Sequence, residues 1–211
     1  NSLALLGWSI GPDRDVFSLE ELVAAFDISS VNPNPARFDQ KKAESINGDH
    51  IRLLTAEDFL ERCVPYLNQA GLTGEVLTDA ERTLLSAVLP HVQPRVGLLG
   101  EVPGMVAFFF TSDDELTVSE DAAATLKESA AAVLDSALSA LKALDSWTLE
   151  SLEQALRTAL VEDLGISPRL AFGPVRVAIS GRRVSPPLFE SLEILGKDSS
   201  LVRLEKLRAS L

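Results

Sequence analysis

The sequence has little of what disulfide-linked, membrane-spanning or exported proteins need. It contains one cysteine, Cys63, which excludes an internal disulfide and a cysteine-based metal cluster. No apolar run approaches the ~20 residues that span a membrane, and no basic segment followed by an apolar run indicates a signal peptide. We therefore expect a cytoplasmic protein. Because the chain does not begin with methionine, we expect it to be processed or a piece of a longer protein.

The side chains that usually carry catalysis are also scarce. His50 and His91 lie far apart, with no acidic or cysteine ligand at helical spacing, which argues against a metal site. Cys63 lies on the apolar stripe of its segment and is typical of a small core residue. The run Asp113–Glu115 could hold a divalent cation, but such charge runs are more typical of a solvated turn. Glycine-rich phosphate loops are missing. We therefore assign no catalytic residue and no metal ligand.

Positive charge is in short supply overall, but it is unevenly spread. The net charge of −12 argues against a general affinity for nucleic acid. From Gly165 to the end, however, the chain has eight basic and four acidic residues, whereas the preceding part has 11 basic and 27 acidic residues. This asymmetry predicts a local anion-binding site on a body that otherwise repels anions.

Hydrophobic periodicity predicts helices along the whole chain. Apolar residues recur at helical spacing after capping-box sequences such as Ser18–Glu21 and Thr78–Glu81. The longest predicted helix is alanine-rich and covers about Glu120–Leu144, and another covers Leu149–Leu164. Val31–Arg37 predicts a proline-broken loop. With about nine or ten helices and no alternating strand pattern, the fold class is all-α.

The segment Gly165–Phe189 predicts a helix-turn-helix corner. Ser167 is a good N-cap and Pro168 a good first helical residue, while Gly181 suits the end of that helix. Ser185-Pro186 then predicts a second helix start. Arginine forks suit phosphates and base edges, although a solvated turn between two core helices would have the same pattern. The arginines of this segment are Arg169, Arg176, Arg182 and Arg183.

Five short motifs in a fixed order carry a family resemblance. They are LALLGW at Leu3–Trp8, FSLEEL at Phe17–Leu22, FDxxK at Phe38–Lys42, NGxxIR at Asn47–Arg52 and LFESLEILGK at Leu188–Lys197. Together they resemble the C-terminal half of bacterial glutamyl-tRNA synthetase, a class I aminoacyl-tRNA synthetase. The resemblance covers the whole chain. It places the catalytic fold, with its HIGH and KMSKS-type signatures, before residue 1.

The resemblance also implies a domain organisation. Residues 1–54 would be the end of the tRNA stem-contact domain. Residues 55–117 and 118–211 would be the first and second helical anticodon-binding domains, two small helical bundles in series. The acidic turn near Asp113–Glu115 agrees with this second boundary, because little apolar sequence crosses it.

Candidate tRNA-binding residues follow partly from the resemblance and partly from charge. Arg95 matches the family position that reads the third anticodon base. Three further positions match contacts at the corner near the C-terminus, namely Arg176, Ser185 and Leu188. We add Arg182 and Arg183 because of their charge alone. A guanidinium can make a bidentate contact to a base edge, and unstacked single-stranded bases are the usual targets of sequence-specific RNA readers.

The function implied is tRNA recognition in protein biosynthesis. The full enzyme would be glutamate–tRNA ligase, which activates glutamate with ATP and attaches it to tRNA(Glu), using ATP and Mg, with no cofactor in this part. We expect the anticodon region of tRNA(Glu) as the partner, a monomer, and no membrane or DNA partner. The alternative is a helical protein-interaction scaffold without an RNA role. An independent hydrolase is a weaker third possibility, because the sequence offers no catalytic set.

Overall fold

The computed structural model describes residues 1–33 and 37–211, so positions 34–36 of the predicted loop 31–37 lie outside the described residues. Within those two ranges every regular element is helical and no strand forms, which confirms the all-α prediction. The α-helices are α1 (Leu19–Ala25), α2 (Gln40–Arg52), α3 (Ala56–Gln69), α4 (Asp79–Val92), α5 (Val102–Val106), α6 (Glu120–Ala123), α7 (Ala130–Lys142), α8 (Leu149–Leu156), α9 (Pro168–Ser180), α10 (Leu188–Leu195) and α11 (Lys197–Ala209).

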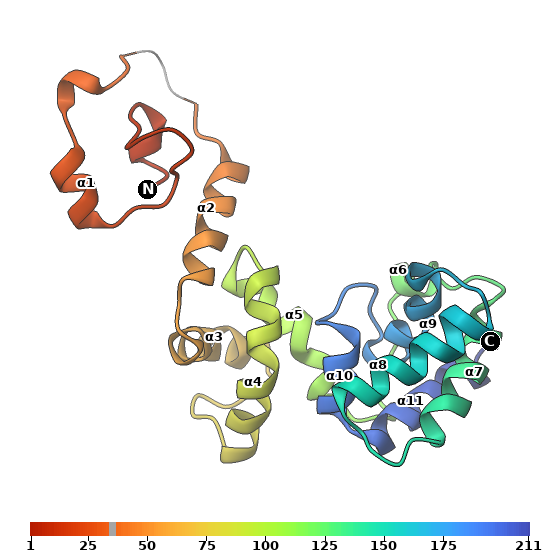
Figure 1. Cartoon of the computed structure of the whole chain (residues 1–211). Helices are drawn as coiled ribbons and strands as arrows, with labels where there is room; N and C mark the ends of the chain where they lie inside the picture. Colours follow the sequence, from red (N-terminus) through yellow and green to blue (C-terminus); the bar gives the residue numbers. More distant parts are fainter. Residues whose placement is uncertain (34–36) are drawn as a thin grey trace.

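Short helical turns connect these elements. The 3-10 turns are η1 (Ala4–Leu6), η2 (Ile28–Ser30), η3 (Gln93–Arg95), η4 (Leu99–Glu101) and η5 (Ala107–Phe109), and η6 (Arg157–Asp163) is a π-helix. Among the described residues, no helix combines the length and the apolar character needed to span a bilayer. The elements form an elongated molecule with three parts, which Figure 1 shows from the N-terminal part through α3–α5 to α6–α11.

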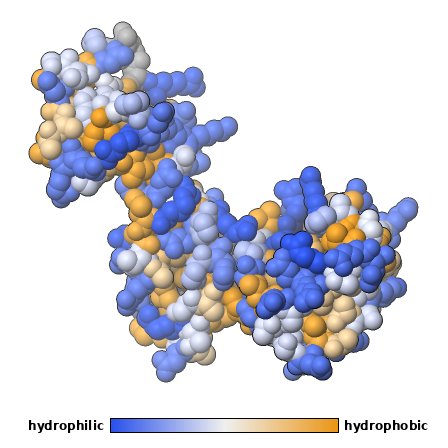
Figure 2. All heavy atoms as spheres, in the orientation of Figure 1, coloured by the Kyte–Doolittle hydropathy of each residue, from blue (hydrophilic) through white to orange (hydrophobic). Residues whose placement is uncertain are grey.

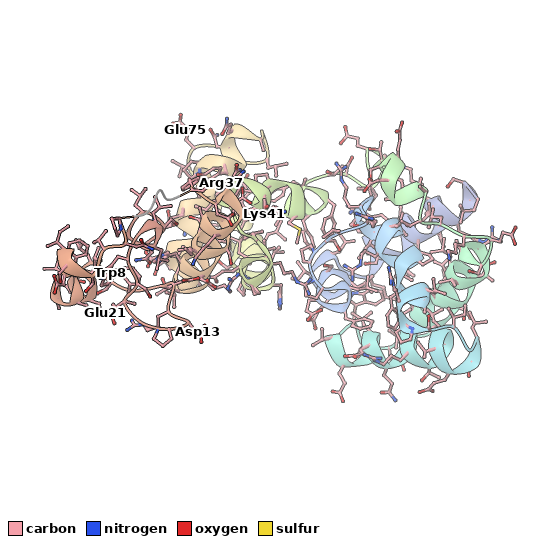
Figure 3. All side chains as sticks on the ribbon, turned by 90° about the horizontal axis from the view of Figure 1, so that it is seen from above. Trp8, Asp13, Glu21, Arg37, Lys41 and Glu75 are labelled. Carbon is pink, nitrogen blue, oxygen red and sulfur yellow. The ribbon has the colours of Figure 1, made fainter. Side chains whose placement is uncertain are left out.

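The N-terminal part is small and leaves many of its large hydrophobic residues exposed. Trp8 is its buried centre, with the rings of Phe17 and Phe26 at centroid distances of 6.0 and 5.7 Å. Viewed from above, Trp8 lies at the end of the molecule away from α6–α11 (Figure 3). Hydrophobic side chains are visible on the surface of this part (Figure 2). Its large exposed hydrophobic residues include Leu3, Leu19, Val23, Phe26, Ile28 and Phe38.

The first of two hydrophobic cores lies between α3, α4 and α5. Helix α4 starts at the predicted capping box, where Thr78 accepts a hydrogen bond from the backbone N–H group of Glu81, and Thr55 caps α3 in the same way through Asp58. Ile51, at the end of α2, also packs into this core. The other buried members are Phe59, Leu60, Cys63, Leu67, Leu85, Val88, Leu89, Val92, Val96, Val102 and Val106.

The second core lies between α7, α9 and α11, and is completed by α8 and α10. Its buried residues come from positions 122 to 207. The largest fully buried members are Leu134, Leu141, Leu152, Leu156, Leu160, Ile179, Leu192 and Leu204. This core carries the helix-turn-helix corner between α9 and α10, so the corner is built on a rigid support.

The two cores are joined by direct packing as well as by the chain. Helix α10 packs against α4, and Ile194 of α10 contacts the first core. On the other side of the junction, the buried Arg203 of α11 donates hydrogen bonds to the carbonyl oxygens of Phe108, Thr111 and Ile179 at 2.8–2.9 Å. These contacts fix η3 in the first unit relative to α9 in the second.

The prediction of one long helix over Glu120–Leu144 is wrong for the middle of that segment. The chain forms α6 over only four residues and begins α7 at Ala130. The Thr125 hydroxyl donates to the Ala122 carbonyl oxygen at 2.6 Å, and such a side-chain bond competes with continuation of the helix. The predicted helix Leu149–Leu164 is also divided, into α8 and the π-helix η6.

Candidate nucleic-acid interface

Arg95 is held on a rigid turn with its side chain in solvent. It ends η3, which continues directly from α4. The preceding Gln93 donates from Nε2 to the carbonyl oxygens of Ile51 and Leu54, at 2.8 and 2.9 Å. The following Val96 is 2% exposed. Because both neighbours are anchored, the position of Arg95 is set although its own side chain forms no hydrogen bond or ion pair with any described residue.

The loop that follows Arg95 is also fixed. Asn47 donates from Nδ2 to the Gly97 carbonyl oxygen at 2.6 Å, which ties the loop to α2. The Glu101 carboxylate accepts from the backbone N–H groups of Gly97 and Leu98 at 2.9 and 3.3 Å. Arg95 therefore projects from a preorganised surface, as a base-reading residue requires.

Arg176 lies in the second half of α9 and is hydrogen-bonded to the segment that forms the corner. Its Nη1 donates to Ser185 Oγ at 2.6 Å and to the Pro186 carbonyl oxygen at 2.7 Å. These bonds hold the segment between α9 and α10 against the helix. Ser185 therefore does not cap α10 as expected from the Ser-Pro pattern, because its hydroxyl is taken by Arg176, and Pro187 occupies the N-cap position instead.

Arg95 and Arg176 belong to the two helical units and lie near enough for their charges to interact. Burial, and after it the neighbouring Arg95, lower the pKa of the Arg176 guanidinium below its ordinary value, while Glu190 acts in the opposite sense. Neither arginine is in a salt bridge with any described carboxylate. Two like charges that interact repel each other, and an anion near both would relieve the repulsion, as the Glu190 carboxylate does in part for Arg176. The geometry therefore favours an anionic ligand at the junction of the units.

Ser185 and Leu188 are both inside the corner. Ser185 is 3% exposed and Leu188 is 4% exposed, and the Leu188 side chain belongs to the second core. In this conformation Ser185 orients Arg176, and Leu188 supports the start of α10. Their roles as tRNA contacts stay predictions.

Arg182 and Arg183 lie in the exposed turn that follows α9. Gly181 ends the helix with φ 66°, as the sequence predicts. Arg183 Nε is 3.9 Å from Asp121 Oδ2, with both side chains about two-thirds exposed, so this ion pair is weak. The Arg182 side chain has no hydrogen bond or ion pair within the described part of the chain. Both arginines are placed where a large ligand can reach them.

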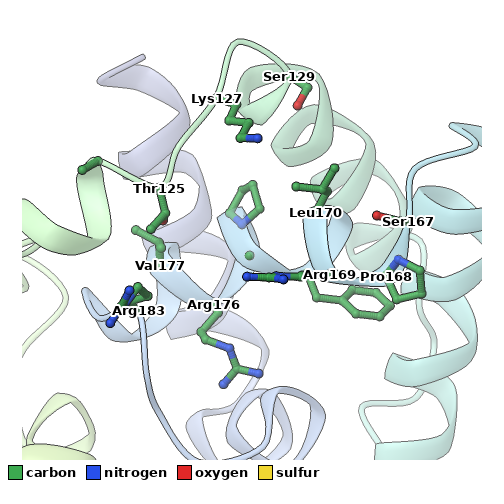
Figure 4. A pocket seen from close by; sticks show the side chains of 14 residues that line it. Thr125, Lys127, Ser129, Ser167, Pro168, Arg169, Leu170, Arg176, Val177 and Arg183 are labelled. Carbon is green, nitrogen blue, oxygen red and sulfur yellow. The ribbon is translucent and has the colours of Figure 1, made fainter.

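An open cavity of about 960 Å³ lies beside Arg176. Figure 4 shows Lys127, Arg169, Arg176 and Arg183 around it. These are the four cations among the lining residues, and no lining residue is acidic. The remaining lining residues are Ala124, Thr125, Ser129, Ser167, Pro168, Leu170, Phe172, Gly173, Pro174 and Val177.

Lys127 was not a candidate from the sequence, because the predicted helix Glu120–Leu144 placed it in the middle of a regular element. The break after α6 turns residues 124–129 toward α9 and brings Lys127 to the cavity. Arg169 was noted as one of the corner arginines but was not selected. The only sequence signal for either residue was its positive charge in an acidic chain.

The groups considered for catalysis or metal binding do not form a site. Cys63 is fully buried, and burial raises the pKa of its thiol to about 12, so it is protonated near neutral pH. His50 Nε2 lies 2.7 Å from Asn1 Oδ1. Asp113 pairs with Arg203. Among the described residues, no three His, Cys, Asp or Glu side chains come together as a metal site would require.

Comparisons with known proteins agree on one family. A family described as "Anticodon binding domain" matches residues 58–208. The glutamate–tRNA ligase of Paenarthrobacter aurescens is 58% identical over 208 residues, which are 99% of this chain and 41% of that protein. The corresponding ligase of Kocuria rhizophila is 59% identical over the whole chain and 42% of its own length.

A solved structure shows the same fold. The crystal structure of a glutamate tRNA ligase from Elizabethkingia meningosepticum, in complex with its amino acid, covers the whole chain with a TM-score of 0.77 and 21% identity. This chain covers 40% of that protein. The chain therefore spans about two-fifths of the length of the relatives that it matches.

Proposed function

We propose that this chain, which belongs to the anticodon binding domain family, binds the anticodon loop of a tRNA and positions that tRNA for a reaction carried out elsewhere in a larger protein. One observation carries the proposal. Arg95 and Arg176 come from different helical units, lie near enough for their charges to interact, and form no salt bridge with any described carboxylate. Unstacked bases with their phosphates offer both the edges and the charge that such guanidiniums bind.

The whole protein would be a glutamate–tRNA ligase. The similarity to ligases of this name along the entire chain supports that assignment. Such an enzyme activates glutamate with ATP and Mg and transfers it to tRNA(Glu), and the catalytic residues would lie outside this chain. We propose a cytoplasmic, monomeric protein, in line with the sequence.

The domain limits remain part of the proposal. We propose that residues 1–54 end the stem-contact domain and that 55–117 and 118–211 are the two helical anticodon-binding domains. The two separate hydrophobic cores support the second limit. Ile51 packs into the first core, so the first limit falls just after a packed contact.

The alternative is a helical scaffold that binds proteins and has no RNA role. Salt dependence separates the two functions, because a module that contacts phosphates loses tRNA affinity steeply as salt rises. We would titrate the full-length protein and this chain with intact tRNA(Glu) and with an anticodon stem-loop over a salt series. Salt-sensitive binding of the stem-loop supports the proposal, and no measurable binding of either RNA by the full-length protein would reject it.

Arg95→Ala in the full-length protein is expected to reduce discrimination at the third anticodon base by about 1–3 kcal/mol, because a bidentate base contact is lost. The measurement is kcat/KM for aminoacylation of tRNA(Glu) and of variants at that base. Arg82→Ala is the matched control, since Arg82 is an exposed arginine of the same unit that pairs with Glu61. Unchanged relative kcat/KM values for the variants would show that Arg95 does not read this base.

Arg182→Ala combined with Arg183→Ala is expected to weaken binding of all tRNAs by a similar factor, because exposed arginines in a turn contact phosphates more readily than base edges. The measurement is the dissociation constant for tRNA(Glu) and for anticodon variants over a salt series. Removal of two phosphate contacts should reduce the slope of log affinity against log salt concentration, the salt slope, by about two. If affinity and slope both stay the same, the two side chains are only solvated.

A further inference from the structure

The cavity beside Arg176 combines four cationic side chains with the absence of any acidic lining residue. We propose that it is a phosphodiester-binding site, which holds the sugar–phosphate backbone of a loop nucleotide next to the bases that Arg95 and Arg176 would contact. This inference rests on the proposed anticodon-loop function and extends it to residues that neither the sequence motifs nor the comparisons assign. The residues added are Lys127 and Arg169.

The two added cations are available for a ligand. Within the described residues, the side chains of Lys127 and Arg169 form no hydrogen bond and no ion pair. Many other cations of this acidic chain are paired, for example Arg208 with Asp135 and Lys142 with Glu205. In a chain with 31 acidic and 19 basic residues, four cations around one cavity without an acidic lining residue form a local positive site that a bound anion would neutralise.

The cavity adjoins one of the candidate base-reading residues. Arg176 lines the cavity, and its charge interacts with that of Arg95. A strand of RNA that contacts Arg95 and Arg176 would therefore pass close to the cavity. In Figure 4 the Arg169 side chain extends across the cavity, and Lys127 reaches toward it from the opposite wall.

The size and lining suit a nucleotide unit better than a free phosphate ion. About 960 Å³ lies near the upper end of the range for ligand clefts and far exceeds the volume of a single inorganic anion. Leu170, which is exposed, and the partly exposed Phe172 add apolar surface on which a ribose or base can lie. The hydroxyl groups of Thr125, Ser129 and Ser167 add hydrogen-bonding capacity for ribose hydroxyls.

Contact with the backbone is favoured over base reading at this site. Lys127 and Arg169 are exposed, and no described neighbour fixes the orientation of their charged ends. Lys127 also has no planar fork for a bidentate contact to a base edge, whereas a phosphate accepts a cation from many directions. The cavity would therefore add affinity and register without adding sequence preference.

The test is Lys127→Ala combined with Arg169→Ala in the full-length protein, titrated with tRNA(Glu) and with third-base anticodon variants over a salt series. We expect affinity to fall by a similar factor for every tRNA and the salt slope to decrease by about two. Arg169→Lys should keep most of the affinity, because a phosphate contact needs charge rather than a planar fork. Circular dichroism and thermal unfolding check that the variants fold like the wild type.

The outcomes separate failure of the cavity inference from failure of the proposed anticodon-loop function. If the wild type binds no tRNA, the proposed function fails and this inference fails with it. If the wild type binds and Arg95→Ala has its expected effect, but the double variant is unchanged, only the cavity inference is rejected. A loss confined to one anticodon would show base reading and overturn the backbone assignment. An equal loss in Arg82→Ala would show that overall charge matters rather than the cavity.

Discussion

Arg203→Met is expected to destabilise the chain by about 3–5 kcal/mol, because it breaks a buried charged network by removing one partner. The guanidinium is 3% exposed and donates to Asp113 Oδ1 and to the carbonyl oxygens of Phe108, Thr111 and Ile179. Methionine fills a similar volume but satisfies none of these acceptors. The carbonyl groups and the half-buried carboxylate would then lie in a space that water reaches poorly. The measurement is the free energy of unfolding in urea.

The partners of Arg203 make the expected loss more than a local one. They belong to η5, to the segment that follows it and to the last turn of α9, so the network ties the first unit to the helix that carries Arg176. We therefore expect Arg203→Met to weaken tRNA binding under conditions where the variant is still folded. Anticodon discrimination by Arg95 should fall with it, because the spacing of Arg95 and Arg176 is no longer fixed.

Arg208→Met is the matched control on the same helix. Arg208 makes two hydrogen bonds to the Asp135 carboxylate, at 2.8 and 2.9 Å, but at the surface, where water replaces the lost partner. Its substitution should leave stability and tRNA binding close to those of the wild type. Equal losses in the Arg203 and Arg208 variants would contradict the special role of the buried network.

Local sequence signals predicted helix starts and ends well. The capping boxes at Ser18 and Thr78 form as expected, and Gly181 ends α9 in the left-handed conformation. These features depend on residues within a few positions of one another. The break after α6 was missed because alanine-rich sequence favours a continuous helix, whereas the Thr125 side chain and the packing of Leu126 against the second core act against it.

Long-range features could not be predicted in the same way. Arg203 is buried because it finds its acceptors in distant parts of the chain, and those of Phe108 and Thr111 lie more than 90 residues earlier. Arg95 and Arg176 became candidates through family resemblance and charge. The packing of α10 on α4 and the Arg203 network bring their two units together, and a single sequence contains no signal for either.

Gly181→Ala is expected to cost about 2–5 kcal/mol of stability, for two separate physical reasons. The residue has φ 66°, which costs a side-chain-bearing residue roughly 1–2 kcal/mol. A Cβ atom at this position would also lie 2.2 Å from the Thr117 carbonyl oxygen, and overpacking of this kind typically costs about 1–3 kcal/mol. The backbone around Thr117 has little freedom to move, since the Ser119 N–H donates to the Gly181 carbonyl oxygen at 2.9 Å.

Gly165→Ala separates the two contributions, because Gly165 has nearly the same φ, 65°, but a Cβ atom added there would have no neighbouring atom within 4 Å. It should show only the backbone cost. The stability difference between the two variants, measured by urea unfolding, then reports the clash with Thr117. Since the Gly181 turn carries Arg182 and Arg183, Gly181→Ala should also weaken tRNA binding, and Gly165→Ala should do so much less. If the two variants lose the same stability, the segment at Thr117 yields easily and does not hold the corner in place.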